Sequence, residues 1–183
     1  MKVLVAYASR TGFTKGIAEF IGEKLRGRGM QVDVQAAESV KSPEGYDAFV
    51  IGSAVYMFHW LKEAKSFVSK NRALLRTRPV WLFSSGPVGT KTTDAQGRDL
   101  REVSGPKEID ELQEATKPRD HRVFFGALEG TRLKGAMGFM YRMVRRSESA
   151  RESMPEGDFR HWQEIEAWAN GIAEVCLANS TKV

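Results

Sequence analysis

The residues best suited to chemistry in this sequence form a hydroxyl-rich segment near the amino terminus. Three hydroxyl side chains and one glycine fall within six consecutive residues, Ser9, Arg10, Thr11, Gly12, Phe13 and Thr14. Backbone N–H groups at a helix start favour an anion, hydroxyls add donors, and glycine lets the backbone approach closely. The segment therefore predicts a phosphate cradle that needs no buried lysine or arginine. The alternative is an ordinary capped helix start.

The spacing within this segment separates it from two other phosphate motifs. It matches neither Gly-x-Gly-x-x-Gly nor the P-loop pattern, which requires Gly-Lys followed by Ser or Thr. We therefore expect a phosphate monoester rather than a dinucleotide or a nucleoside triphosphate.

The elements that must position this segment alternate between short β runs and longer helical patterns. Such alternation predicts an α/β fold, a doubly wound parallel sheet with helices on both faces. Five strands are predicted over residues 2–7, 31–35, 48–51, 80–84 and 123–128, and helices over residues 14–28, 60–75, 106–116 and 161–177. Residues 85–105 are expected to be a surface loop, and residues 1–183 a single domain. Ligands bind such sheets at the carboxyl ends of the strands, where residues 9–14 lie.

Residues 129–160 form an insertion after the fifth strand, far longer than an ordinary connection. Within it, Leu133, Met137, Met140 and Val144 share one helical face, surrounded by basic residues. This helix would either lie on an anionic membrane or cover a substrate that carries carboxylates, or else pack on the domain or in a dimer. The sequence favours neither interpretation.

Composition limits the class of protein and its partners. The 183 residues are 42% hydrophobic and 28% charged, which is typical of a soluble globular protein. Neither an apolar run long enough to span a membrane nor a signal-peptide cleavage site is evident, so we expect a cytoplasmic protein. The net charge of +5 favours anionic partners. Nucleic acid is not expected, because no nucleic-acid-binding pattern accompanies the charge. No metal site is predicted.

The segment at residues 9–14 resembles the phosphate loop of flavodoxins, with every position of Ser-x-Thr-Gly-x-Thr filled. The resemblance implies a flavodoxin-like sheet in the order 2-1-3-4-5 and an FMN cofactor. It also implies two loops that contact the isoalloxazine ring, the first after the third strand and the second after the fourth. The cofactor-binding residues expected there are Ser53, Ala54, Tyr56, Phe58, His59, Trp60, Ser84, Ser85, Gly86, Pro87, Val88 and Gly89.

The first of these loops contains several aromatic residues that could contact the flavin. Tyr56 is expected to stack on the isoalloxazine, whereas Trp60 belongs equally well to the core face of the following helix. His59 would donate a hydrogen bond to the flavin or substrate, or be structural. The three loops contain no Asp or Glu, and Arg10, His59 and Lys91 are their only potential charges. We therefore hypothesise a flavin more oxidising than that of acidic flavodoxins.

Among flavodoxins, the chain is most similar to the bacterial menaquinone-dependent protoporphyrinogen oxidase family. The similarity rests on residues 50–54 followed by an aromatic and His59, on residues 117–128 and 159–162, and on the insertion. It implies oxidation of a reduced substrate such as a porphyrinogen and transfer of electrons to a quinone. The amphipathic helix within residues 129–160 would add a peripheral membrane contact. No catalytic side chain is assigned. The alternatives are a non-enzymatic electron carrier for a redox partner protein, and a related protein that uses a deazaflavin.

Overall fold

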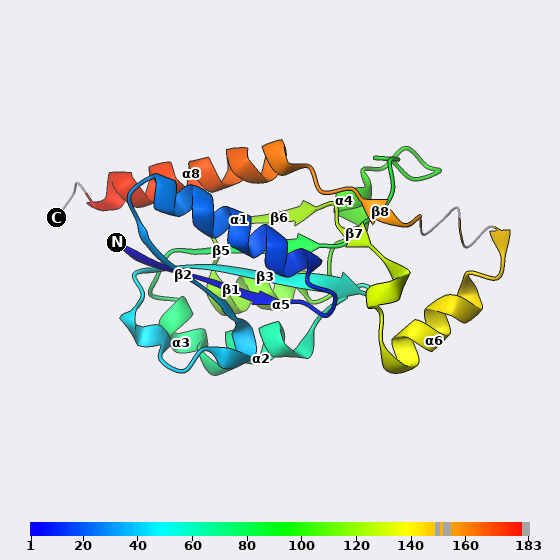
Figure 1. The fold of residues 1–183 in the computed structure, drawn as a ribbon. Coiled ribbons are helices and arrows are strands. Elements are labelled where there is room, and N and C mark those ends of the chain that lie inside the picture. Colours follow the sequence, from blue (N-terminus) through cyan, green and yellow to red (C-terminus); the bar gives the residue numbers. More distant parts are fainter. Residues whose placement is uncertain (149–150, 152–154, 181–183) are drawn as a thin grey trace.

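A five-stranded parallel sheet forms the centre of the molecule (Figure 1). The structure, a computed structural model, describes residues 1–148, 151 and 155–180. The strands lie in the order β2-β1-β3-β5-β6, which is the predicted order 2-1-3-4-5. Their bounds are β1 (Lys2–Ala8), β2 (Gln31–Ala36), β3 (Ala48–Tyr56), β5 (Val80–Ser85) and β6 (Asp120–Phe124).

Helices cover both faces of this sheet, as predicted. Helices α1 (Phe13–Gly27) and α8 (Trp162–Ser180) pack on one face, and α2 (Lys62–Lys70), α3 (Arg72–Leu75) and α5 (Ile109–Thr116) pack on the other (Figure 1). Successive side chains of a strand point to opposite faces. In β1, Val3 therefore joins the core under α1 and α8, while Leu4 joins the core under α2 and α5.

The third strand is longer than predicted and turns back on itself. β3 continues to Tyr56, and β4 (His59–Trp60) pairs with it in antiparallel register, Val55 opposite Trp60 and Tyr56 opposite His59. The prediction of a helix over residues 60–75 was therefore wrong at its start, because Trp60 completes a hairpin. The helical stretch begins at Lys62 and divides into α2 and α3.

The prediction for the fifth strand was also wrong at both ends. β6 runs from Asp120 to Phe124, and a separate strand, β7 (Ala127–Leu128), follows. Between them, Gly126 N–H donates to the carbonyl of Pro87 at 2.8 Å, which draws the chain out of the sheet. β7 then pairs in antiparallel register with β8 (Gly157–Asp158). This ribbon closes the base of the insertion.

The insertion carries η3 (Gly130–Arg132) and α6 (Gly135–Val144), which extends beyond the carboxyl edge of the sheet (Figure 1). Leu133 is buried before the helix begins, whereas Met140 and Val144 are exposed on it. The side chain of Met137 lies outside the described part of the structure. The predicted helix therefore exists, but much of its expected apolar face is open.

Shorter helices in the described part of the chain include η1 (Ala37–Ser39), η2 (Pro43–Gly45) and α4 (Leu100–Val103). Because α4 begins at Leu100, with Asp99 capping its Arg101 N–H, the expectation of a continuous loop over residues 85–105 was wrong there. None of the helices in the described part of the chain has the length and apolarity needed to cross a membrane.

Candidate functional site

Three loops leave neighbouring strands at one edge of the sheet. They follow β1, β3 and β5, and the strand register sets Ala8 beside Ser53 and Ser53 beside Ser84. The chain order reverses between β1 and β3, the position where doubly wound sheets bind ligands. The structure therefore brings all three predicted cofactor segments to one edge.

The first loop presents backbone donors to an anion. Gly12 adopts a left-handed conformation with φ of 88° immediately before α1, and its N–H donates to the Ser9 hydroxyl at 3.1 Å. No described side chain caps α1, and its first turn holds no acidic residue. The unpaired N–H groups at a helix start, together with the positive end of its dipole, favour a phosphate. The donor set therefore fits the predicted phosphate group.

Two arginines that the sequence did not indicate also reach this loop. Arg132 lies 4.7 Å and Arg160 5.4 Å from the centre of the Phe13 ring. Arg160 Nη1 donates to the carbonyl of Phe13 at 3.1 Å across a separation of 147 residues. The prediction of a cradle that needs no buried lysine or arginine did not include these two arginines. No local pattern could have found these contacts, because folding alone brings the segments together.

The second loop is the tight turn between β3 and β4. Met57 and Phe58 occupy it with φ values of 50° and 65°, a conformation that disfavours side chains with a Cβ. Both residues are exposed, Met57 at 80% and Phe58 at 50%. Next to them, Tyr56 lies under the Arg10 guanidinium at 5.9 Å, which links this loop to the first. Burial raises the pKa of Tyr56, although a hydrogen bond with Thr11 and the charge of Arg10 oppose the shift.

An acidic residue from outside the loops anchors this turn. Glu108 Oε1 lies 2.9 Å from His59 Nδ1 and accepts a hydrogen bond from Lys65 Nζ at 2.6 Å. Burial opposes ionisation of Glu108, but the hydrogen bonds from Lys65 and His59 outweigh it and lower its pKa to about 2. The neighbouring Lys107 N–H donates to the carbonyl of Phe58. His59 therefore has a carboxylate partner, although the three loops themselves contain no Asp or Glu.

Trp60 lies in the core. It is 2% exposed, and its indole N–H donates to the Ser84 hydroxyl at 2.8 Å. Ser84 Oγ also lies 2.9 Å from His121 Nε2. Because indole can only donate, the Ser84 hydroxyl can donate its own proton to a neutral His121. Ser53 is also buried, and its hydroxyl accepts from Leu61 N–H at 3.0 Å. The Trp60, Ser84 and Ser53 side chains are thus used to build the loops.

The third loop is held by β6 and touches the insertion. Gly86 N–H donates to the carbonyl of Phe124, and the carbonyl of Pro87 accepts a hydrogen bond from Gly126 N–H. Gly89 has a φ of 115°, and a Cβ placed on it would lie 3.3 Å from Pro155 Cγ. The insertion thus contacts the first loop through Arg132, and its Pro155 lies beside Gly89 of the third loop. In the same region Ala54, Ser85 and Gly89 are buried, and Val88 is half-buried.

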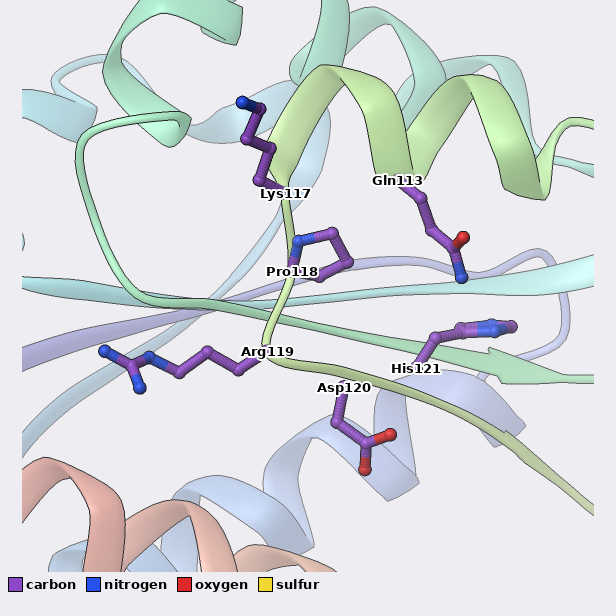
Figure 2. Close-up of a pocket in the computed structure, with 6 residues that line it drawn as sticks. All are labelled: Gln113, Lys117, Pro118, Arg119, Asp120 and His121. Carbon is purple, nitrogen blue, oxygen red and sulfur yellow. The ribbon is translucent and has the colours of Figure 1, made fainter.

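A separate polar pocket opens at the amino end of β6. Figure 2 shows Asp120 and His121 projecting to opposite sides of the strand. The Asp120 carboxylate accepts from the Trp168 indole of α8 at 2.8 Å, whereas His121 faces α5. Burial lowers the pKa of His121 to about 4, with the Asp120 charge acting in the opposite direction. The pocket opens before the carboxyl ends of the strands, where the three loops begin, although its His121 lies 2.9 Å from Ser84. Its lining residues are Gln113, Lys117, Pro118, Arg119, Asp120 and His121.

Fold and site together define a doubly wound α/β domain with a phosphate cradle at its switch point. The flavodoxin domain family matches residues 4–154, so the chain belongs to this family, whose fold implies a flavin cofactor. The chain is also similar to protoporphyrinogen IX dehydrogenase (quinone) from Escherichia coli strain K12. The two are 25% identical over 178 residues, with 96% of each covered.

Solved flavodoxin structures share the fold. Flavodoxin 2 from Bacillus cereus is 19% identical with a TM-score of 0.59, and the alignment covers 95% of this chain and 99% of that one. A flavodoxin from the domain Archaea is 19% identical with a TM-score of 0.57, with coverage of 95% and 97%. At this identity the likeness concerns the fold alone.

Proposed function

We propose that this protein is an FMN-dependent oxidoreductase that oxidises a reduced substrate of the porphyrinogen type and passes the electrons to a quinone. One observation carries the proposal: an exposed apolar helix flanked by cations is anchored beside the cofactor loops of a flavodoxin domain. The E. coli relative that aligns over 96% of this chain is named for the same reaction. When bound, the flavin supplies the redox chemistry, and the protein positions the substrate.

The surface of α6 has the chemistry of a site for an apolar, anionic partner. Phe139 is 62%, Met140 50% and Met143 54% exposed, and the exposed Arg142 and Arg146 accompany them. Exposed apolar groups next to arginines suit an anionic lipid surface that holds a quinone. The same groups suit a flat apolar ring whose carboxylates pair with guanidinium groups. We propose that the membrane contact is peripheral and is made through residues 129–160.

The anchoring of α6 supports a functional surface rather than a helix packed on the domain. The Tyr141 hydroxyl donates to Glu156 Oε1 at 2.8 Å, and Gly130 N–H donates to the same oxygen at 2.9 Å. Arg145 bonds both to the Tyr141 hydroxyl and to Glu156. These contacts hold one side of the helix, while its apolar side stays open.

Two measurements test the proposal directly. The mass and absorption spectrum of the ligand released from the purified protein distinguish FMN from a deazaflavin. Steady-state oxidation of protoporphyrinogen with a quinone acceptor then tests the reaction, and absence of turnover by flavin-loaded protein would contradict it.

Point variants test the role of α6. Met140→Glu should lower turnover with a membrane-bound quinone by about tenfold, the factor that corresponds to about 1.4 kcal/mol. Leu177→Glu is the matched control, because Leu177 is 43% exposed on α8, outside the insertion. Flavin affinity should be unchanged in both variants. Equal turnover of Met140→Glu and Leu177→Glu would show that α6 has no part in the reaction.

A non-enzymatic electron carrier is the second candidate, because Met57 and Phe58 expose an apolar tip at the second cofactor loop. A carrier would dock its redox partner through such a tip. Reduction by a reductase protein without turnover of protoporphyrinogen would favour this function over the first.

A further inference from the structure

Two arginines from opposite ends of the insertion meet at Phe13, the first residue of α1. Arg132 ends η3, and Arg160 lies just before α8. Both guanidinium groups are within cation–π distance of the Phe13 ring. They differ in how their hydrogen-bonding capacity is used.

The guanidinium group of Arg160 already has partners within the protein. Its Nη1 donates to Phe13 O, while Nε and Nη2 both pair with Asp158, and the guanidinium lies 4.4 Å from the Trp162 ring centre. Its side chain is only 12% exposed. A Cβ on Gly16 would lie 2.7 Å from Arg160 Nη1, so the helix leaves space for this arginine. Arg160 therefore ties the start of α8 to α1, with its charge balanced by Asp158.

Arg132 keeps donor capacity beside the cradle. Its Nε donates to Glu129 Oε2 at 2.6 Å, but its Nη1 makes only a long contact of 3.5 Å with the carbonyl of Thr11. The side chain is 52% exposed. Arg132 Nη1 would lie 3.9 Å from a Cβ on Gly12, the residue at the mouth of the cradle. A guanidinium fork with available donors thus stands where the loop presents its N–H groups.

We infer that Arg132 is a phosphate-clamping residue, and that through it cofactor binding fixes the position of the insertion. The inference rests on the proposed FMN cofactor. A phosphate dianion in the cradle attracts the Nη groups of Arg132 in a charge-assisted contact. The β7–β8 ribbon closes the base of the insertion, so a contact at Arg132 restrains the segment that carries α6. By linkage, a partner that favours the same position of the insertion strengthens cofactor binding.

The first test compares FMN with riboflavin, which lacks the phosphate. Flavin fluorescence quenching gives the Kd of each for the wild type, Arg132→Gln, Arg132→Lys and the control Arg142→Gln. Arg132→Gln should weaken FMN binding by about tenfold and leave riboflavin binding within twofold. Arg132→Lys should be intermediate, because it keeps the charge but loses the fork. Arg142→Gln removes the same charge from an exposed position of α6 and should match the wild type.

The controls separate this inference from the proposed function. An equal loss for FMN and riboflavin in Arg132→Gln would assign Arg132 to packing on Phe13 and overturn the clamp. The same FMN loss in Arg142→Gln would indicate a long-range charge effect and also overturn it. Unchanged FMN affinity in Arg132→Gln overturns the clamp while the proposed function stands. A wild type that binds neither flavin overturns both.

Hydrogen exchange tests the coupling to the insertion. In the wild type, saturating FMN should slow exchange across residues 129–144 at least threefold more than saturating riboflavin. In Arg132→Gln this difference should disappear, whereas Arg142→Gln should retain it. Equal protection by the two flavins in the wild type would show that phosphate binding and the insertion are independent.

Discussion

Replacing His121 with glutamine should make the protein less sensitive to acid. In the structure, the Trp60 indole donates to Ser84, and Ser84 Oγ lies 2.9 Å from His121 Nε2. A neutral imidazole accepts from the Ser84 hydroxyl, whereas a protonated one cannot. Burial lowers the pKa of His121 from 6.5 to about 4, against the opposing charge of Asp120. Between these two pH values the unfolded state binds a proton that the folded state does not.

The sign and size of the effect follow from this linkage. The contribution is fully present above pH 6.5, declines as the pH falls, and is lost below about pH 4, where both states are protonated. Each pKa unit corresponds to 1.36 kcal/mol, so the wild type should lose up to about 3 kcal/mol of folding free energy across this window through His121. Glutamine does not titrate there, and its amide can still bond to Ser84. The His121→Gln variant should therefore lose less folding free energy than the wild type across this pH window.

Urea unfolding between pH 7.5 and 4 measures the difference directly. His161→Gln is the control, because the His161 side chain is 54% exposed, and it should follow the wild type. An NMR titration that placed the His121 pKa near 6.5 would refute the argument. So would parallel stability profiles of His121→Gln and the wild type.

Other residues give shorter tests. The ionised Glu108 contributes folding free energy of the order of 2–3 kcal/mol, which is present above about pH 4.5 and lost as the pH falls towards 2. Glu108→Gln should remove this contribution, so the stability of the variant should fall less on acidification. Gly12→Ala should cost about 1–2 kcal/mol of stability, because φ is 88° there, and should raise the Kd for FMN. Met57→Gly should raise the free energy of unfolding by about 1 kcal/mol by relieving a φ of 50°. Glu156→Ala should increase proteolysis within residues 129–144 while leaving the thermal transition of the sheet unchanged.

The sheet could be predicted from the sequence because its signals are local. Buried strands are continuous apolar runs, and the helices that follow them repeat their apolar residues at helical spacing. The segment at residues 9–14 was equally visible, since hydroxyls, glycine and helix start are adjacent in the chain. The errors fell where pairing between strands decides the structure. Trp60 continues an apolar periodicity into α2, yet pairing of Val55 with Trp60 places it in a hairpin.

The contacts of the candidate site that the sequence did not predict also join residues apart in the chain, at longer separations. Glu108 lies 49 residues from His59, and Arg132 lies 121 residues from Thr11. Charges that look isolated in the sequence acquire partners only in the fold. The hypothesis of an oxidising flavin depends on loops without carboxylates, and Glu108 adds a carboxylate beside His59 from outside these loops. Lys65 pairs with Glu108, so a positive charge accompanies this carboxylate, and the redox potential of the flavin-loaded protein tests the hypothesis.

The contacts of the insertion explain how one segment can serve both cofactor and substrate. Arg132 near its start and Arg160 at its end reach the phosphate loop, and Pro155 lies beside Gly89 of the third loop. Between these points, α6 is held by Tyr141 and Glu156 and presents its apolar residues outward. A helix attached by a flexible tether would place those residues at no fixed distance from the flavin. Attachment at both ends sets that distance, so changes at Arg132, which precedes α6 in the chain, should affect how α6 is presented.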